Sequence, residues 1–439
     1  MQKSVTFIKV SAAISGLAFS ASAFAAGFQI NEVSPTIQAT ALADAATASG
    51  DLSGMAFNPA TLATIDSPDV YAAASVIIPH ISYNNATSSL PIGNPGTVTS
   101  ENNISPTAFV PAGYFGAPMP GALHNLHAGI GIDVPFGLET NYNRNWVGQF
   151  NALESKIQVL NIFPTLAYEI TPKLDVGASI NVEHISATYS NAFDTIGDAQ
   201  IGNGLSTLTG SAWGMGYSVG VMFKPTSTTT LGADYHSTVR ESINGTATIS
   251  ESTGLALPDG QHPGSVVIKL PATVNLGISQ MITQRLTLMA GAEWTQWDSI
   301  PSIDANIQGL LLPGITTPDN STLNYHNTWL FSIGGSYLIT PKLKAMAGLA
   351  YDQTPTNNEY RDARIPGTNR KWLTMGLAYN MTKNFSVFGT YEHIFMNNQS
   401  INSTEQGPSI DGVPLSPSQV SADYSGYANI VAAGLNYKF

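Results

Sequence analysis

The stretch Thr287-Leu288-Met289-Ala290-Gly291-Ala292-Glu293-Trp294-Thr295 decides the fold of this chain. Every second residue from Leu288 to Trp294 is apolar, and the residues between them are smaller or more polar, a period of two that indicates a β-strand. The same alternation closes the chain at Tyr427–Phe439. Long strands with one apolar and one mixed polar face, joined by tight turns, are typical of an outer-membrane barrel.

Repeated turns organise the rest of the chain. Tyr168–Leu174, Gln280–Leu286, Tyr337–Leu343 and Tyr379–Phe385 each end one alternating run and begin the next. The pattern predicts an all-β, antiparallel transmembrane barrel with an even number of strands, about fourteen, over Asp69–Tyr83, Thr107–Ala117, His124–Val134, Lys156–Ile170, Leu174–Tyr189, Ser211–Phe223, Thr229–Ile249, Gly264–Ile282, Gln284–Trp297, Leu323–Ile339, Lys342–Tyr351, Lys371–Met381, Asn384–Phe395 and Gly426–Phe439.

The first residues predict export. Lys3 and Lys9 precede and flank an apolar run up to Phe19, and the small-residue sequence Ala23-Phe24-Ala25 follows. This is the pattern of a secretory signal peptide, residues 1–25, with cleavage after Ala25. We therefore expect the outer membrane of a Gram-negative bacterium as the location.

Composition excludes several classes of function. Charged residues make up 10% of the chain and mean hydropathy is +0.05, which is less charge than a soluble surface carries. The net charge of -12 argues against nucleic acid as a partner. Cysteine is absent, which excludes disulfides, thiolate nucleophiles and cysteine-based metal sites. No cofactor and no metal are predicted.

The segment from Ala26 to Ser67 does not alternate and has no face suited to lipid. It would either hang in the periplasm or fold inside the barrel as a plug. The plug is favoured, because a fourteen-strand barrel has an interior too wide for its own side chains to fill. The predicted barrel then covers residues 68–439.

Prolines gather in the first strands. Pro79, Pro111, Pro135 and Pro164 lie in or at the ends of the first four, and each proline in a strand removes a ladder donor. A closed barrel has no edges where prolines are tolerated. We therefore expect a local interruption of the wall near the third strand, where Asp133-Val134-Pro135-Phe136-Gly137 leaves regular strand geometry.

Short motifs in a fixed order resemble the FadL/TodX family of outer-membrane transporters for hydrophobic compounds. The resemblance covers the mature chain end to end and rests on the ordered set Gly27–Glu32, Asn58-Pro59-Ala60, Ser105–Ala108, Pro135–Thr140 and Leu270–Thr273. It implies a hatch that plugs a fourteen-strand barrel, an inward kink in the third strand, and sideways release of substrate through the wall.

The resemblance also assigns candidate roles to single residues. Phe28 matches the hatch N-terminus near the ligand pocket. Asn58, Pro59 and Ala60 match the hatch motif beside the wall opening, and Pro135-Phe136-Gly137 matches the kink. The chain departs from the family's fatty-acid importers in two places, a short Ser190–Gly210 loop and the lack of a basic residue in His184–Ser190.

Two cations are candidates for holding a substrate carboxylate. Continuing the alternation along the seventh and eighth strands puts Arg240 and Lys269 in the lumen, where a cation in an apolar pocket offers charge-assisted hydrogen bonds. The alternative is an ion pair with Glu241 or Asp234 that only supports the barrel.

Two other motifs are weaker. Gly216-Tyr217-Ser218-Val219-Gly220 fits the pattern of a hydrolase nucleophile, but it lies inside an alternating strand rather than at a strand-to-helix elbow. His124 and His127 point to opposite faces of a strand and lack an evident third ligand. We expect no enzymatic activity.

The sequence therefore predicts a passive uptake channel for long-chain fatty acids or similar hydrophobic small molecules. Uptake of neutral aromatic hydrocarbons, a general diffusion porin, a lipid-modifying enzyme and an adhesin stay open as alternatives. Expected partners are the hydrophobic substrate, outer-membrane lipid and lipopolysaccharide, and the barrel-insertion machinery, which reads a terminal aromatic residue such as Phe439.

Overall fold

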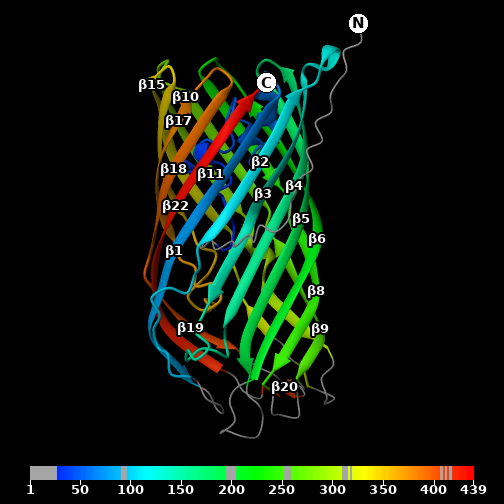
Figure 1. Ribbon diagram of the computed structural model, residues 1–439, viewed down its shortest axis with the longest axis vertical. Helices are drawn as coiled ribbons and strands as arrows, with labels where there is room; N and C mark the ends of the chain where they lie inside the picture. The colour runs from blue at the N-terminus through cyan, green and yellow to red at the C-terminus, as the bar shows by residue number, and fades with distance from the viewer. Residues whose placement is uncertain are drawn as a thin grey trace.

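The strands close into one antiparallel barrel (Figure 1). This computed structural model describes residues 27–89, 96–193, 204–251, 259–308, 315–316, 319–405, 409–410, 413–414 and 418–439. The first strand, β1 (Asp69–Ser89), pairs with the last, β22 (Ser418–Lys438), and this ladder closes the wall. The predicted signal peptide lies outside the described residues.

The fourteen-stranded barrel predicted from the sequence is confirmed. Between β1 and β22 the wall is made of β2 (Ala108–Pro118), β3 (Leu126–Asn141), β4 (Glu154–Thr171), β5 (Leu174–Phe193), β6 (Gly204–Phe223), β7 (Thr229–His236) continued by β8 (Val239–Ser250), β9 (Gly260–Leu270) continued by β10 (Thr273–Met281), β11 (Leu286–Thr295) continued by β12 (Ser302–Ile307), β14 (Asp319–Thr322) with β15 (Thr328–Thr340), β16 (Leu343–Asp352), β17 (Arg370–Asn380), and β18 (Phe385–Met396) continued by β19 (Gln399–Glu405).

A few small elements lie outside the wall. Two-residue strands β13 (Ile315–Thr316), β20 (Ser409–Ile410) and β21 (Val413–Pro414) form a separate sheet, and short 3₁₀ turns occupy η3 (Gly121–Leu123) and η4 (Trp297–Ser299). Short turns join the strands at the end that is uppermost in Figure 1, and long connections join them at the other end. In barrels of this kind the short turns face the periplasm.

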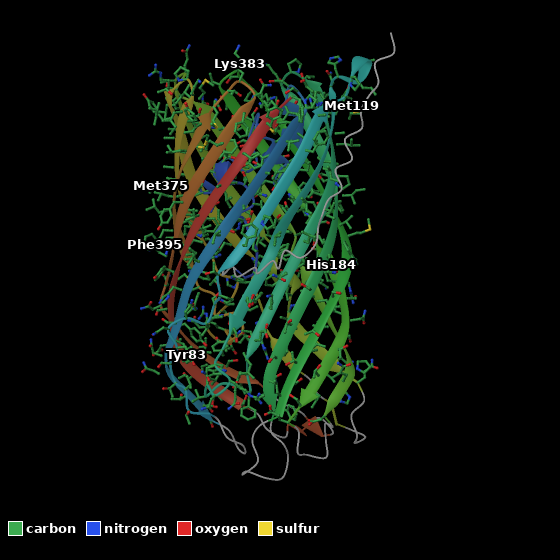
Figure 2. All side chains as sticks on the ribbon, in the orientation of Figure 1. Tyr83, Met119, His184, Met375, Lys383 and Phe395 are labelled. Atoms are coloured by element: carbon green, nitrogen blue, oxygen red, sulfur yellow. The ribbon has the colours of Figure 1, made fainter. Side chains whose placement is uncertain are left out.

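The alternation seen in the sequence is an alternation between lumen and exterior. Leu288 on β11 is 47% exposed, whereas Glu293 on the other face is 6% exposed. Met375 and Phe395 likewise point away from the barrel (Figure 2). Apolar side chains therefore cover the outer surface, and the polar face of each strand lines the interior.

The alternation between lumen-facing and outward-facing residues shifts by one residue part-way along two adjacent wall strands, β7 with β8 and β9 with β10. On β7 Asp234 is buried in the lumen, yet after Ser237 and Thr238 it is Val239, not Arg240, that points inward. The neighbouring wall strand shows the same one-residue shift between β9 and β10, where Pro271 interrupts the strand. A shift of one residue moves every later side chain to the opposite face.

The N-terminal segment, residues 27–67, contains α1 (Pro35–Gln38), η1 (Leu52–Ala56) and η2 (Pro59–Thr64). Its helical turns begin at Ser34, Asp51 and Asn58, whose side chains accept backbone N–H bonds as N-caps. Hydrogen bonds join it to inward-facing groups on strands far apart around the wall, through Ser75, Val221, Thr374 and Thr390. Figure 1 shows this segment in dark blue within the ring of strands.

Candidate functional site

The third strand breaks where the sequence predicted an interruption. β3 pairs with β2 only from His127 to Ile132, and its ladder with β4 shifts register between Asp133 and Phe136. The N-terminal segment takes over the backbone groups that are freed. Ile30 N donates to the carbonyl of Pro135 (2.8 Å), and Gly137 N donates to the carbonyl of Phe28 (2.8 Å).

Phe28 anchors this junction. Its side chain is fully buried and packs against Phe136 with ring centroids 5.8 Å apart and against Trp297 at 5.2 Å. Gly27 adopts a positive φ of 70°, and a Cβ there would meet the Trp297 ring at 2.4 Å. The kink and the start of the N-terminal segment therefore form one packed unit.

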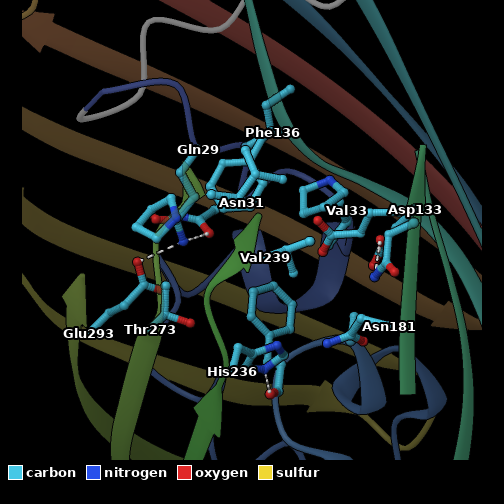
Figure 3. Close-up of a pocket in the computed structure, with 18 of the residues that line it drawn as sticks. Gln29, Asn31, Val33, Asp133, Phe136, Asn181, His236, Val239, Thr273 and Glu293 are labelled. Atoms are coloured by element: carbon cyan, nitrogen blue, oxygen red, sulfur yellow. Dashed lines mark hydrogen bonds between the residues drawn. The ribbon is translucent and has the colours of Figure 1, made fainter. Parts of the chain in front are cut away.

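A chamber lies behind the kink (Figure 3). We call it the inner chamber. The N-terminal segment supplies one wall, and the barrel supplies the rest from β3, β4, β5, β7 to β8 and β9 to β11. It is lined by Gln29, Ile30, Asn31, Val33, Ala56, Phe57, Asp133, Pro135, Phe136, Asn161, Asn181, Glu183, His236, Ser237, Val239, Leu270, Pro271, Thr273, Asn275 and Glu293.

Only one basic side chain lines the inner chamber within the described part of the chain, and it is a histidine. His236 Nε2 lies 2.5 Å from the carbonyl of Phe57, and Nδ1 lies 3.0 Å from Ser218 Oγ. A carbonyl can only accept and a hydroxyl can donate, so these partners satisfy a neutral imidazole. The chamber thus holds carboxylates without a lysine or arginine on its described lining.

A second cavity lies nearer the outer ends of the strands. We call it the outer cavity. Most of its lining is aliphatic: Leu138, Ser155, Lys156, Ile157, Ala187, Thr188, Tyr189, Leu208, Val266, Ile268, Ile303, Ala305, Arg364 and Ile365. Several of these residues belong to one continuous apolar cluster that also contains Phe28, Phe136, Val239 and Leu270. That cluster connects the outer cavity with the inner chamber.

The outer cavity carries two cations. Lys156 Nζ lies 3.0 Å from Glu139 Oε2. Arg364, from the connection between β16 and β17, is 3% exposed and lies over the ring of Tyr189 at 3.3 Å. Its Nη1 donates to Ser155 Oγ (3.1 Å) and to the carbonyl of Ser190 (3.2 Å). A guanidinium keeps its charge when buried, and its planar fork suits a carboxylate.

The predicted lumen orientation of Arg240 and Lys269 is wrong. They lie opposite each other on β8 and β9, but both side chains are exposed on the outer face. Glu241, Ile268 and Leu270 point inward in their place. The reason is the one-residue shift described above, so these two cations line neither cavity.

The triplet Asn58-Pro59-Ala60 lies away from the kink, against β5 and β6. Asn58 Nδ2 donates to the carbonyls of Ala46 (2.8 Å) and Val221 (3.2 Å), and its Oδ1 accepts from Ala60 N (3.0 Å). A Cβ at Gly220 would lie 1.9 Å from Asn58 Oδ1. The motif therefore seats the N-terminal segment on the wall.

Ser218 lies within β6, with no elbow. Its hydroxyl is bonded by Asn181 (2.7 Å) and by His236. His127 is buried with Nε2 3.2 Å from the carbonyl of Ile65, and His124 is exposed. Within the described residues no group of three or more metal-ligating side chains occurs.

Comparison with known proteins adds the family. The model described as "Outer membrane protein transport protein (OMPP1/FadL/TodX)" matches residues 16–439. The chain belongs to this FadL/TodX family. Members are outer-membrane transport proteins, and the chain is accordingly an outer-membrane transporter of hydrophobic compounds rather than a member of an enzyme family.

FadL/TodX relatives match over nearly the whole chain. Outer membrane protein P1 of Haemophilus influenzae is 27% identical over 453 residues, 94% of this chain and 95% of that protein. The long-chain fatty acid transport protein of Escherichia coli O6:H1 is 22% identical over 422 residues, 88% of this chain and 91% of that protein.

Solved structures share the FadL/TodX fold. A Pseudomonas aeruginosa FadL homologue superposes with a TM-score of 0.81 at 22% identity, covering 94% of this chain and 100% of that one. The Ralstonia pickettii toluene transporter TbuX gives 0.64 at 20% identity, covering 93% and 99%.

Sequence reasoning missed the cations of the outer cavity. Arg364 follows no periodic pattern, because it lies in an irregular connection. The available signal was the grouping of Arg361, Arg364 and Arg370 in a chain with only 17 lysines and arginines. Lys156 begins a predicted strand, but alternation with Ile157 would place it on the opposite face, so the pattern gave no signal for its position at the cavity.

Proposed function

We propose that this family member takes up long-chain fatty acids, which bind in the outer cavity with the carboxylate at Arg364. The observation that carries the proposal is an aliphatic cavity with a buried guanidinium at its edge. A charge-assisted hydrogen bond in such surroundings gives affinity for an acid that a neutral hydrocarbon lacks.

Lateral release follows the outer cavity in the proposed route. The apolar cluster leads from the cavity to Phe28 and Phe136 at the kink. A hydrophobic molecule that entered the periplasm along the barrel axis would lose about 0.8 kcal/mol for each CH₂ exposed again to water. Exit beside Pro135-Phe136-Gly137 into the bilayer avoids that loss.

The N-terminal segment serves as the plug of this channel in the proposal. Its hydrogen bonds reach β1, β6, β17 and β18, and its residues are mostly buried. Such a segment favours a gated route over an open pore. The predicted domain division, 26–67 as hatch and 68–439 as barrel, is part of the same proposal.

The test compares palmitate with hexadecanol, which has the same tail and no charge. We expect Arg364→Met to weaken palmitate binding to the purified protein by roughly 10- to 100-fold, the equivalent of a charged hydrogen bond of about 1.5–3 kcal/mol. Hexadecanol binding is expected to change little, and Arg364→Lys to retain part of the palmitate affinity.

The double variant Arg240→Met and Lys269→Met is the matched control, because it removes two cations that point outward at neighbouring strands. We expect it to bind palmitate like the native protein. Equal loss of palmitate and hexadecanol in Arg364→Met would contradict a head-group role. Neutral aromatic hydrocarbons would then become the favoured substrates.

A further inference from the structure

Inward-facing acidic and amide side chains form a row across the wall of the inner chamber. Asp133 on β3 lies opposite Asn161 on β4, Asn161 lies opposite Glu183 on β5, and Glu183 lies opposite Gly214 on β6. A Cβ on Gly214 would lie 2.3 Å from Glu241 Oε1, so the carboxyl group of Glu241 occupies the space above that glycine. Side chains directly opposite in a ladder are close neighbours.

A second row lies farther around the same wall, on β7, β10 and β11. Asp234 on β7 is opposite Asn275 on β10, and Asn275 is opposite Glu293 on β11. Asn275 Nδ2 donates to Asp234 Oδ2 at 2.9 Å. Carboxyl groups therefore approach the inner chamber from both sides, separated by amides.

The amide donors of the chamber are directed at protein oxygens. Gln29 Nε2 donates to Glu293 (2.9 Å), Asn161 Nδ2 to Asp133 (3.3 Å), and Asn181 Nδ2 to Ser218 (2.7 Å). Figure 3 shows the Gln29 and Asp133 bonds at opposite sides of the chamber. These three amide donors are thus turned toward the protein, away from a ligand.

Two hydrogen-bond acceptors on the chamber lining have no donor within the described residues. Glu183 is 5% exposed and its Oε2 has no hydrogen-bond partner within the described residues; Asn161 is 7% exposed and its Oδ1 has none there either. The amide oxygen of Asn161 accepts in every protonation state of its neighbours, because its nitrogen is the donor to Asp133. Buried acceptors of this kind require a donor.

We propose that the inner chamber binds the head group of the substrate in an uncharged form that donates a hydrogen bond, a hydroxyl or a protonated carboxyl, and rejects anionic head groups. The donor would pair with Glu183 Oε2 or Asn161 Oδ1. An anion would meet the carboxyl rows with no arginine or lysine on the described lining to balance it.

This inference deepens the proposed function and rests on it for the fatty-acid case. A fatty acid held as carboxylate at Arg364 gains one proton from solvent, forming one O–H bond, before its head group enters the inner chamber. The two cavities then discriminate by opposite rules, since the outer cavity favours the anion and the inner chamber favours the neutral acid.

The experiment measures uptake into vesicles carrying the purified protein, with hexadecanol and hexadecane sulfonate as probes. The sulfonate has the same tail and a permanent negative charge. We expect native protein to take up hexadecanol about tenfold faster than the sulfonate.

Two variants test which side chains cause this difference. In the double variant Glu183→Gln and Asp133→Asn, the ratio of sulfonate uptake to hexadecanol uptake rises several-fold, because the negative charge is removed while an amide oxygen remains as an acceptor. Glu169→Gln, at the periplasmic end of β4 outside the chamber lining, is the control and behaves like the native protein.

Photocrosslinking supplies a readout that does not require transport. A diazirine beside the head group should label chamber peptides of β4 and β5 when carried by hexadecanol. When carried by the sulfonate, it should label only the lining of the outer cavity. Equal labelling of the chamber by both probes, or equal uptake of both by the native protein, would overturn the inference. Chamber labelling by hexadecanol alone, without uptake of any probe, would leave the inference standing and refute the proposed function.

Discussion

The outer cavity and the inner chamber are neighbours in one lumen, yet they differ in both chemistry and origin. The outer cavity is aliphatic with cations at its edge, and barrel strands and loops supply all of its lining. The inner chamber is polar with carboxyl groups, and the N-terminal segment supplies one of its walls. In the proposed mechanism, one barrel separates the binding of a hydrophobic acid from the selection of what is released.

Deleting residues 27–67 is expected to have the largest effect, because the deletion changes the inner chamber and leaves the outer cavity intact. The inner chamber loses the wall that runs from Gln29 to Phe57, whereas the outer cavity keeps its lining. We expect a large steady ion current in a planar bilayer, little current from the intact mature chain, and palmitate binding that is retained.

The barrel of the deleted protein serves as its own control, because a folded barrel migrates faster on a gel before heating than after it. A large current from the intact mature chain would contradict the plug and favour a porin.

Straightening the third strand tests the exit from the inner chamber. The substitutions Pro135→Val and Gly137→Thr introduce residues that favour regular strand pairing. In this double variant β3 should continue its pairing with β2 beyond Ile132. We expect uptake of hexadecanol to fall about tenfold or more, equivalent to roughly 1.4 kcal/mol on the rate-limiting barrier, with normal amounts of folded protein.

Pro79→Val is the matched control, since Pro79 lies in β1 opposite Ala428 within a continuous ladder. It is expected to transport normally. If the doubly substituted protein folds and transports at the native rate, exit at the kink has to be abandoned.

Filling the outer cavity tests whether this cavity, rather than the inner chamber, holds the tail of the substrate. Ile268→Trp places an indole among Ile157, Val266 and Ile303. We expect palmitate and hexadecanol to lose affinity equally, by several-fold, in contrast to the selective loss in Arg364→Met. A ligand-binding titration of both variants measures this, and a loss confined to palmitate would place the tail elsewhere.

The smallest expected effect concerns pH. Burial raises the pKa of Glu32 from 4.5 to about 7, against the lowering influence of a backbone hydrogen bond and of Arg370. The folded state therefore favours the protonated carboxyl, whose stabilising contribution is complete below pH 4.5 and is lost as the pH rises through about 7.

Hydrogen exchange of the N-terminal segment measures this contribution. We expect weaker protection at pH 8 than at pH 5, and Glu32→Gln should remove most of the difference. Unchanged protection in the native protein across this range would contradict the assignment.

The strands could be predicted from the sequence because turn and alternation are local properties, as Thr287–Thr295 illustrates. Which side chains point into the lumen could be predicted only from the periplasmic turn up to the first one-residue shift in the strand. Ser237-Thr238 and Pro271 change the face without breaking the apolar and polar alternation, so Arg240 and Lys269 were assigned to the wrong side.

The carboxyl row could not be predicted, because it depends on register. Asp133, Glu183 and Glu241 are far apart in the chain, and only the cross-strand pairing brings them to one level. The family resemblance placed Phe28 near the ligand pocket and Asn58-Pro59-Ala60 beside the wall opening. The contact of Phe28 with Phe136 at the kink and the position of Asn58 on β5 and β6 were not expected.

The paired one-residue shifts also affect how insertions and deletions are tolerated. Lengthening or shortening the chain by one residue at Ser237-Thr238 would turn the outer part of β8 over, bringing Arg240 into the lumen and Glu241 toward lipid. A change of one residue within a connection between wall strands is absorbed there, whereas only Ser237 and Thr238 lie between β7 and β8. Natural variants of this chain are therefore expected to vary freely in length at the outer loops and to keep a fixed residue count between Thr229 and Ser250.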